Sequence, residues 1–378
     1  MINATSQHGL FKRTSDYYTN SDDDSKEVLQ LPVSRQTTLE QEDYGQYPEE
    51  IPGEAQSEIQ DTPSENLPSN ICFQLSKFGE LHGETIAIPR EVFTENIGMY
   101  AEFVGRGSFG KVFKYPKETT ANPVVALKEI YLGLDQSESS RTHRDNVMKE
   151  VETHRTLDHP NIVRYIGSHE TESSIYIVME YLPKGSLYSK LNDLVDPSIP
   201  ALAEATILRY SKQILAGLVY LHSYTENPYN RASIIHRDLR AANILIDDND
   251  NLKLADFGIS KQLEPLATQS QFHTCEIGNL FWRSPEMLTE DQEKIGRKVD
   301  VWSLGITILE MVFVKLPFGL TKIRYLRLID DQDKFENELC KHTEKIKSNI
   351  LVSLINECLT YDGNKRSTSV VLHRSISI

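Results

Sequence analysis

One pair of segments constrains the fold of this chain more than any other feature of its sequence: HRDLRAAN at residues 236–243, followed by DFG at residues 256–258. Asp238, Asn243 and Asp256 place two carboxylates and one amide in loops at fixed intervals. A positioned carboxylate can take a proton from a hydroxyl, and oxygen atoms are the ligands that Mg²⁺ prefers. The spacing therefore predicts a fold that brings these three side chains to one place.

A glycine-rich stretch lies upstream, GRGSFGKV at residues 105–112. Glycine lets the backbone come close to phosphate groups and adopt turn dihedrals that a Cβ would forbid. Taken alone, the stretch could equally be a turn without a ligand. In a dinucleotide-binding fold it would open a helix. Here the strand-forming Val112 and Phe113 follow it, which favours a hairpin that covers phosphates.

Two charged residues follow this stretch in an informative order. Lys128 ends VALK in a predicted strand, and Glu150 lies in a predicted helix over about 144–157. An ammonium at Lys128 can reach phosphate oxygens, and Glu150 can hold that ammonium in place. Surface lysines and glutamates are common, but this order behind a glycine-rich loop points to a nucleotide site.

The predicted elements change character along the chain. The short runs MYAEFV, GKVFKY and PVVALKEI predict an antiparallel meander. Beyond Gly185 apolar residues recur at helical spacing, as in ATILRYSKQILAGLVYLHS. The window 301–314 is the most apolar, but it is short and contains Glu310, so it predicts a buried core helix rather than a membrane span.

The acidity of the chain is concentrated near the N-terminus. Residues 1–90 carry 16 Asp and Glu against 6 Lys and Arg, a net −10 of the total −15. Residues 1–70 are polar and acidic and predict disorder, while 71–98 predict a linker. An acidic surface argues against nucleic-acid or anionic-membrane binding.

The four cysteines show neither disulfide-framework nor zinc-ligand spacing, and the N-terminus lacks an apolar leader stretch. A reducing compartment fits this pattern. We therefore expect a cytoplasmic protein, with the nucleus as a second location, and no membrane insertion.

Residues 99–378 resemble a eukaryotic protein kinase domain, with further landmarks in SPE at 284–286, DVWSLG at 300–305 and Arg366. The resemblance implies an α+β fold of two lobes, with a β-rich N-lobe over about 99–182 and a helical C-lobe over about 183–378. It also implies ATP in the cleft between the lobes and an ion pair between Glu286 and Arg366.

By the same resemblance, Asp238 is the catalytic base and Lys128 binds the α- and β-phosphates. Glu150 positions Lys128, while Asn243 and Asp256 hold Mg²⁺. The cofactors implied are ATP and Mg²⁺, and the partners implied are protein substrates, including downstream kinases.

The resemblance further implies an adenine pocket, with Met179 as the gatekeeper and hinge backbone groups that bind adenine. Val112, Ala126 and Leu245 would contact adenine, although on their residue types alone they could be plain core residues. The positions so assigned to nucleotide binding are Val104, Gly105, Arg106, Gly107, Ser108, Phe109, Gly110, Lys111, Val112, Ala126, Lys128, Met179, Glu180, Leu182 and Leu245.

Within kinases, phrases such as HPNIVRYIGS and GNLFWRSPEML resemble mitogen-activated protein kinase kinase kinases and their sterile-kinase relatives, which implies Ser/Thr specificity. Two departures leave alternatives open. Arg240 stands where Ser/Thr kinases place a lysine that neutralises the transferred phosphoryl group, and Asn279 stands where they place a threonine. A tyrosine or dual-specificity kinase, and a catalytically weak scaffold, therefore stay in play.

Two further positions bear on regulation. His154 replaces an apolar residue one helical turn after Glu150. It is expected to be a satisfied core histidine, and the alternative is that it loosens the helix. Arg237 precedes Asp238 and predicts that a phosphate on the activation segment, at Thr274 or next at Ser270, orders the catalytic loop.

Overall fold

A computed structural model describes residues 70–77, 80–94, 96–107, 110–117, 124–133, 138–196, 201–223, 233–256, 261–262, 277–288, 295–315, 317–319 and 321–376. The predicted disorder of residues 1–70 concerns a segment that, apart from Asn70, lies outside these residues. So do Ser108, Phe109, the phenylalanine and glycine of the DFG motif, and Thr274 with Ser270.

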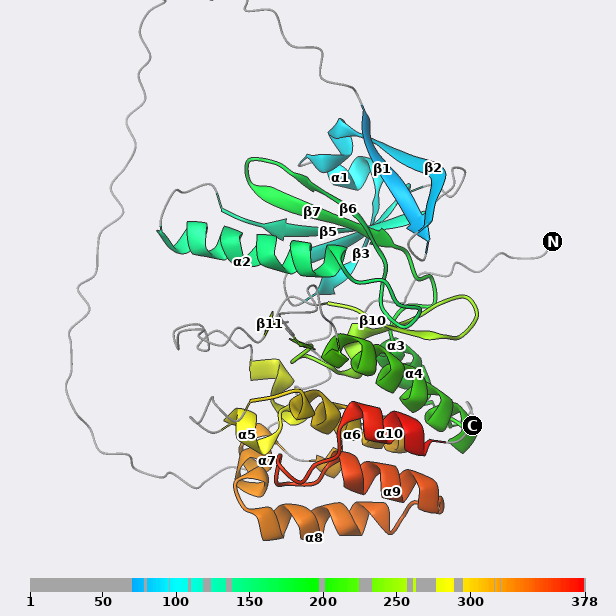
Figure 1. The fold of residues 1–378 in the computed structure, drawn as a ribbon, viewed down its shortest axis with the longest axis vertical. Coiled ribbons are helices and arrows are strands. Elements are labelled where there is room, and N and C mark those ends of the chain that lie inside the picture. Colours follow the sequence, from blue (N-terminus) through cyan, green and yellow to red (C-terminus); the bar gives the residue numbers. More distant parts are fainter. Residues whose placement is uncertain are drawn as a thin grey trace, which may run out of the picture. The chain divides into compact units, whose positions relative to one another are not determined.

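The described chain has a sheet-rich part followed by a helical part (Figure 1). The sheet-rich part contains a five-stranded antiparallel sheet in the order β3-β4-β5-β7-β6. Its strands are β3 (Glu102–Gly107), β4 (Gly110–Tyr115), β5 (Val125–Tyr131), β6 (Tyr165–Glu170) and β7 (Ser174–Glu180). Helix α2 (Glu138–Arg155) lies between β5 and β6 in sequence and contacts β6.

The helical part follows β7. Its helices are α3 (Leu187–Asp193), α4 (Glu204–Ser223), α5 (Pro285–Leu288), α6 (Lys298–Phe313), α7 (Lys322–Ile329), α8 (Gln332–Thr343), α9 (Asn349–Cys358) and α10 (Ser369–Ser375). The short strands β8 (Ile234–Ile235), β9 (Ile244–Ile246), β10 (Leu252–Leu254) and β11 (Lys261–Gln262) and the 3₁₀ turns η3 (Ala241–Asn243), η5 (Ile277–Trp282) and η7 (Pro317–Gly319) complete it. Together these elements confirm the predicted α+β fold with two lobes.

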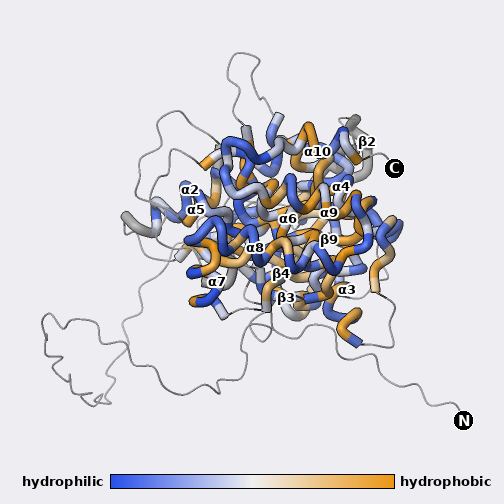
Figure 2. Tube along the Cα trace, turned by 90° about the horizontal axis from the view of Figure 1, so that it is seen from below, coloured by the Kyte–Doolittle hydropathy of each residue, from blue (hydrophilic) through white to orange (hydrophobic). Residues whose placement is uncertain are grey.

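Helix α6 forms the centre of the helical part. Every residue from Val299 to Met311 is buried, so the helix has no solvent-facing side over this length. Figure 2 shows apolar segments around α6 and α9 in the interior, where these two helices contact each other. The predicted buried core helix in the window 301–314 is confirmed. No described helix is long and apolar enough to cross a membrane.

The segment 71–98, predicted to be a linker, contains regular structure. Strands β1 (Asn70–Lys77) and β2 (Glu80–Pro89) form an antiparallel hairpin, followed by η2 (Arg90–Phe93) and α1 (Ile97–Tyr100). Around Ile86 and Ile88 exposed and buried positions alternate. This alternation is too short to identify a strand from sequence, and its pairing partner lies in a second short run.

The β1–β2 hairpin shares a hydrophobic core with the five-stranded sheet. Phe73 and Ile88 are buried in the same cluster as Phe113 and Val178. The contact with β6 is close, since a Cβ built on Gly167 would lie 2.1 Å from the Phe73 ring. A larger residue at position 167 would therefore have to move the Phe73 ring.

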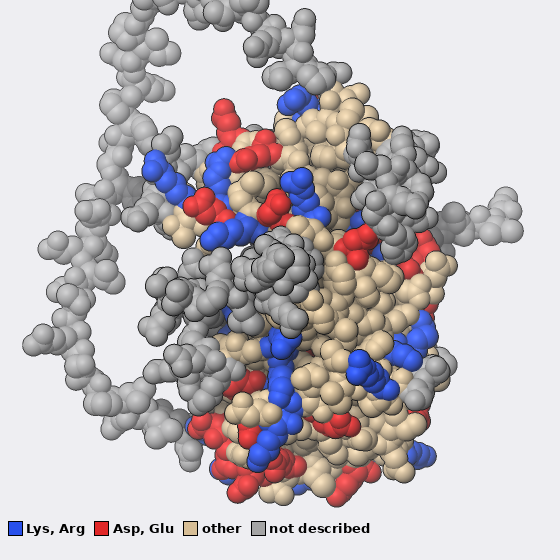
Figure 3. Space-filling view, in the orientation of Figure 1, with Lys and Arg blue, Asp and Glu red and all other residues tan. Residues whose placement is uncertain are grey.

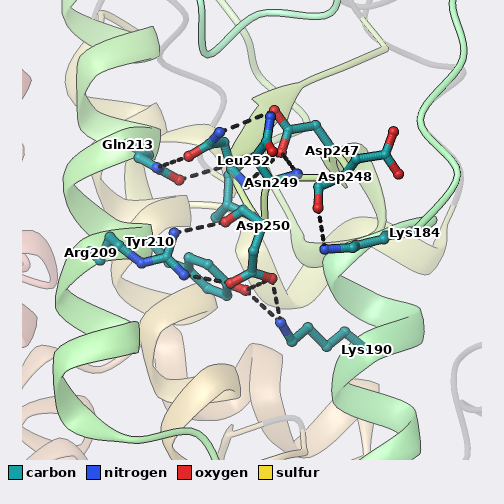
Figure 4. A network of polar contacts seen from close by, with 11 residues as sticks. Lys184, Lys190, Arg209, Tyr210, Gln213, Asp247, Asp248, Asn249, Asp250 and Leu252 are labelled. Carbon is teal, nitrogen blue, oxygen red and sulfur yellow. Dashed lines mark hydrogen bonds and ion pairs between the residues drawn. The ribbon is translucent and has the colours of Figure 1, made fainter.

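The β9–β10 hairpin is anchored to the helical part through its turn (Figure 4). Lys190 on α3 lies 2.8 Å from the Asp250 carboxylate, and Arg209 and Tyr210 on α4 also bind that carboxylate. Gln213 on α4 binds Asn251 and the Leu252 amide in the same turn. The anchor matters for the site because β9 directly follows Asn243 and β10 ends two residues before Asp256.

Candidate active site

Lys128 is the centre of an ion cluster between the sheet and the helical part. Its Nζ lies 2.7 Å from Asp256 Oδ1 and 3.3 Å from Glu150 Oε1. All three side chains are largely buried, at 7%, 13% and 9% exposed for Lys128, Asp256 and Glu150. Strand β5, helix α2 and the loop after β10 thus each supply one member of this ion cluster.

Burial and charge oppose each other in this cluster. Burial alone would lower the pKa of Lys128, but Asp256 and Glu150 outweigh it and raise that pKa above its usual value. Burial would raise the pKa of Asp256, and Lys128 instead holds it low. Burial keeps the pKa of Glu150 raised despite Lys128. At neutral pH the cluster therefore holds a charged ammonium against Asp256 carboxylate.

The predicted catalytic base lies in the loop between β8 and β9. Asp238 is 4% exposed, and the Asn243 amide nitrogen donates to its Oδ2 at 2.7 Å and to its main-chain oxygen at 2.8 Å. Arg240 Nε lies 3.4 Å from Asp238 Oδ1. Burial raises the pKa of Asp238, and Arg240 opposes that shift. A raised carboxyl pKa suits a group that accepts a proton.

The loop is held by a buried residue to which sequence reasoning gave no role. Asp300, in the first turn of α6, accepts the main-chain N–H of His236 at 2.9 Å and that of Arg237 at 2.8 Å. Its Oδ2 also lies 2.9 Å from His222 Nε2 on α4. Arg237 has a positive φ of 64°, so this turn is strained and Asp300 stabilises it. The motif DVWSLG was the only signal for this role.

The two ends of the glycine-rich loop lie close to the ion cluster and to strand β5. Gly107 ends β3 and pairs with Gly110 at the start of β4. A Cβ built on Gly107 would lie 3.5 Å from Asp256 Oδ2. A Cβ on Gly110 would lie 1.9 Å from the Glu129 main-chain oxygen, so β5 excludes any side chain there. The loop therefore lies over the carboxylate predicted to hold Mg²⁺.

The predicted adenine pocket is partly assembled from apolar residues. Met179 and Leu245 pack against a buried cluster that includes Leu182, and Ala126 pairs with Met179 across β5 and β7. Val112 pairs with Lys128 on the adjacent strand. Glu180 differs from its neighbours, since its carboxylate binds Lys253 at 2.7 Å.

These residues fit ATP and Mg²⁺. Lys128 offers a cation for phosphate oxygens, and the Asn243 amide nitrogen is bound to Asp238, which leaves its amide oxygen as the ligand atom. The described residues gather no set of three His, Cys, Asp or Glu that could hold a metal alone. A site of one carboxylate and one amide agrees with this, because Mg²⁺ usually takes its other oxygens from phosphates and water.

The predicted pair of Glu286 and Arg366 is confirmed. Arg366 Nη1 lies 2.6 Å from Glu286 Oε1, and Nη2 lies 3.1 Å from Oε2. The Arg366 guanidinium also packs over the Trp302 ring, 4.8 Å from its centroid. This bidentate contact ties α5, which follows η5, to the helical core.

His154 is a satisfied core residue, as expected. It is 6% exposed, and its Nε2 lies 2.8 Å from the Val163 main-chain oxygen. The Val163 amide in turn donates to Leu254 on β10 at 2.9 Å. His154 thus ties α2, which carries Glu150, to the strand that leads to Asp256. The alternative that it loosens α2 loses its support.

We expect His154 to make the free energy of unfolding depend on pH, so that the fold is less stable in acid. Burial lowers its pKa from 6.5 to about 4, so between these values the unfolded chain binds a proton that the folded chain does not. The free energy of unfolding should therefore fall by on the order of 2 kcal/mol from this residue between about pH 6.5 and pH 5. Chemical denaturation at both pH values measures it.

His154→Leu removes this contribution, so its stability should fall less on acidification than that of the parent chain. His143→Leu, at an exposed histidine on the same helix, is the matched control and should keep the parent's pH dependence. Equal acid sensitivity in the parent chain and His154→Leu would contradict the assignment.

Comparison with known proteins agrees with this geometry. The protein kinase domain model matches residues 99–375, and the chain therefore belongs to the protein kinase family. It is similar to Mitogen-activated protein kinase kinase kinase 1a of Physcomitrium patens, with 34% identity over 72% of this chain and 32% of that relative.

Two further relatives carry related names. Mitogen-activated protein kinase kinase kinase 2 of Arabidopsis thaliana is 34% identical over 58% of this chain and 31% of its own length. MAP kinase kinase kinase mkh1 of Schizosaccharomyces pombe is 30% identical over 84% of this chain and 28% of its own length. The matched region thus spans about a third of these curated relatives.

Proposed function

We propose that this chain is a Ser/Thr protein kinase that transfers the γ-phosphoryl group of ATP to protein substrates in a phosphorylation cascade, with downstream kinases among its substrates. The observation that supports this most directly is the convergence of Asp238, Asn243, Asp256 and Lys128 in one buried site. The similarity to MAP kinase kinase kinases supports the place in a cascade.

In this proposal the residues act by position and charge. Asp238 orients the substrate hydroxyl and takes its proton. Lys128 binds phosphate oxygens, and Glu150 keeps the ammonium directed at them. Asn243 and Asp256 would hold Mg²⁺, which would supply positive charge to neutralise the phosphates. Arg240, beside Asp238, places a cation near the transferred group.

Arg240 favours a second candidate, a tyrosine or dual-specificity kinase. Its planar guanidinium replaces the lysine ammonium typical of Ser/Thr kinases at this position. The Asn279 side chain, the other ground for this alternative, lies outside the described residues. The overall similarity to kinases that act on kinases outweighs this single position.

Incubation with radiolabelled ATP and a protein acceptor, followed by phosphoamino-acid analysis, tests the proposal. We expect label on Ser and Thr and none with Asp256→Ala, which removes a metal ligand. Label on Tyr alone would favour the second candidate. Equal labelling by the parent chain and Asp256→Ala would show that the activity does not come from this site.

A further inference from the structure

Helix α7 has apolar side chains on two faces. Tyr325 and Ile329 are 0% and 3% exposed and pack inward, whereas Ile323 and Leu326 are 65% and 41% exposed. A helix that only covers a core needs one apolar stripe. Single exposed apolar residues are ordinary, but these two lie three positions apart and are therefore neighbours on the helix surface.

Three cations flank these two residues. Lys322, Arg324 and Arg327 lie on α7, which contains no acidic residue. Within the described part of the chain, none of the three side chains has a hydrogen-bond or ion-pair partner. Several other exposed lysines do have one, such as Lys334 with Asp331 and Lys341 with Glu338. Figure 3 shows a narrow strip of Lys and Arg in the area where Figure 1 places α7, with Asp and Glu on both sides of it.

Helix α7 is fixed to η5 by contacts between buried residues. The Tyr325 hydroxyl donates to the Phe281 main-chain oxygen at 2.9 Å, and the two rings lie 5.0 Å apart. Both residues are buried. In the proposed function, η5 includes the position of Asn279 and lies where the substrate would be held, so a bound protein substrate would lie next to α7. The exposed side of α7 carries basic and apolar side chains.

We propose that the α7 surface, defined as Lys322, Ile323, Arg324, Leu326 and Arg327, docks an acidic segment of the protein substrate in which Asp or Glu alternate with aliphatic residues. The inference rests on the proposed function. Carboxylates match the three cations, which have no side-chain partner among the described residues, and aliphatic side chains cover Ile323 and Leu326. Such a contact acts on substrate choice and encounter rate more than on the chemical step.

Direct binding tests the surface without catalysis. The full chain carrying Asp256→Ala is titrated into a short fluorescent peptide in which Asp pairs alternate with Leu, and anisotropy is measured. We expect binding that weakens with salt and that weakens by about tenfold or more in Lys322→Glu/Arg324→Glu/Arg327→Glu. Ile323→Ser/Leu326→Ser should also weaken binding, with less change in its salt dependence.

A matched control changes two lysines and one exposed isoleucine elsewhere, as Lys345→Glu/Lys347→Glu/Ile350→Ser. It should bind the peptide as the parent chain does, and a peptide with Lys in place of Asp should not bind. All replaced side chains are wholly or partly exposed, so thermal unfolding should change little in each variant.

Kinetics with the active chain separates this inference from the proposed function. The charge-reversed α7 variant should show a KM for dephosphorylated casein, an acidic protein, raised by about tenfold. Its KM for ATP and its turnover of a short acceptor peptide should not change. If the parent chain phosphorylates neither acceptor, the proposed function fails, while the binding experiment still decides the docking surface.

Two results would overturn the docking proposal. One is equal affinity of the acidic peptide for the parent chain and both α7 variants, or an equal loss in the control variant. The other is a change of oligomeric state, seen by sedimentation, in the α7 variants without a change in peptide affinity, because the surface would then be a contact between copies of the chain.

Discussion

Asp238→Asn is expected to lower the rate of phosphotransfer by on the order of 10²-fold or more, because an amide cannot accept the substrate proton. The fold should persist, since the Asn243 amide still finds the main-chain oxygen of residue 238. Steady-state rates with a peptide acceptor, together with thermal unfolding, measure both effects.

Asp193→Asn, at an exposed position on α3, is the matched control and should leave both quantities unchanged. Turnover by purified Asp238→Asn at the parent rate would remove Asp238 as the base. Lys128→Met is a poorer probe. It would also leave Glu150 and Asp256 buried without their cation, so lost activity could not be separated from lost stability.

The second large effect concerns stability. Arg366→Leu should lower the free energy of unfolding by about 3–5 kcal/mol, because it takes the bidentate cation away from the largely buried Glu286 carboxylate. The Arg366 side chain is 0% exposed and also donates to the main-chain oxygens of Thr360, Lys298 and Tyr361. Denaturant unfolding at neutral pH provides the measurement.

The double variant Arg366→Leu/Glu286→Leu should recover part of this loss, because the buried carboxylate that lost its cation is removed as well. Lys365→Leu, next in sequence but 80% exposed in its pair with Asp362, should change stability little. If Arg366→Leu were no more harmful than Lys365→Leu, the buried pair would contribute nothing to the fold.

The sequence predicted the residues of the candidate site better than it predicted the residues that hold them in place. Asp238, Asn243 and Asp256 could be identified because a carboxylate, an amide and a second carboxylate at these intervals suit few other purposes. The structure brings them together with Lys128 and Glu150, and their chemical roles stay predictions. Residue type and order along the chain were sufficient to identify these residues.

Other features depend on tertiary partners and could not be read locally. Asp300 accepts hydrogen bonds from two main-chain amides in a loop more than sixty positions earlier in the chain. An aspartate in an apolar helix does not reveal from sequence which amides it will bind. The exposed Ile323 and the buried Tyr325 look alike in an amphipathic pattern until the neighbours of α7 are known. The β1–β2 hairpin was missed because each strand is stabilised by its pairing partner and by the sheet beneath it.

Because of the β1–β2 hairpin, the boundary of the family match differs from the boundary of the compact folded unit. The family match begins at residue 99, inside α1, whereas the compact unit begins at Asn70. A protein cut at the family boundary would leave behind Phe73 and Ile88 and turn Phe113 and Val178 from interior into surface. What the kinase family shares and what this chain needs in order to fold are therefore different lengths of polypeptide, and recombinant fragments or fusions are better designed from the second.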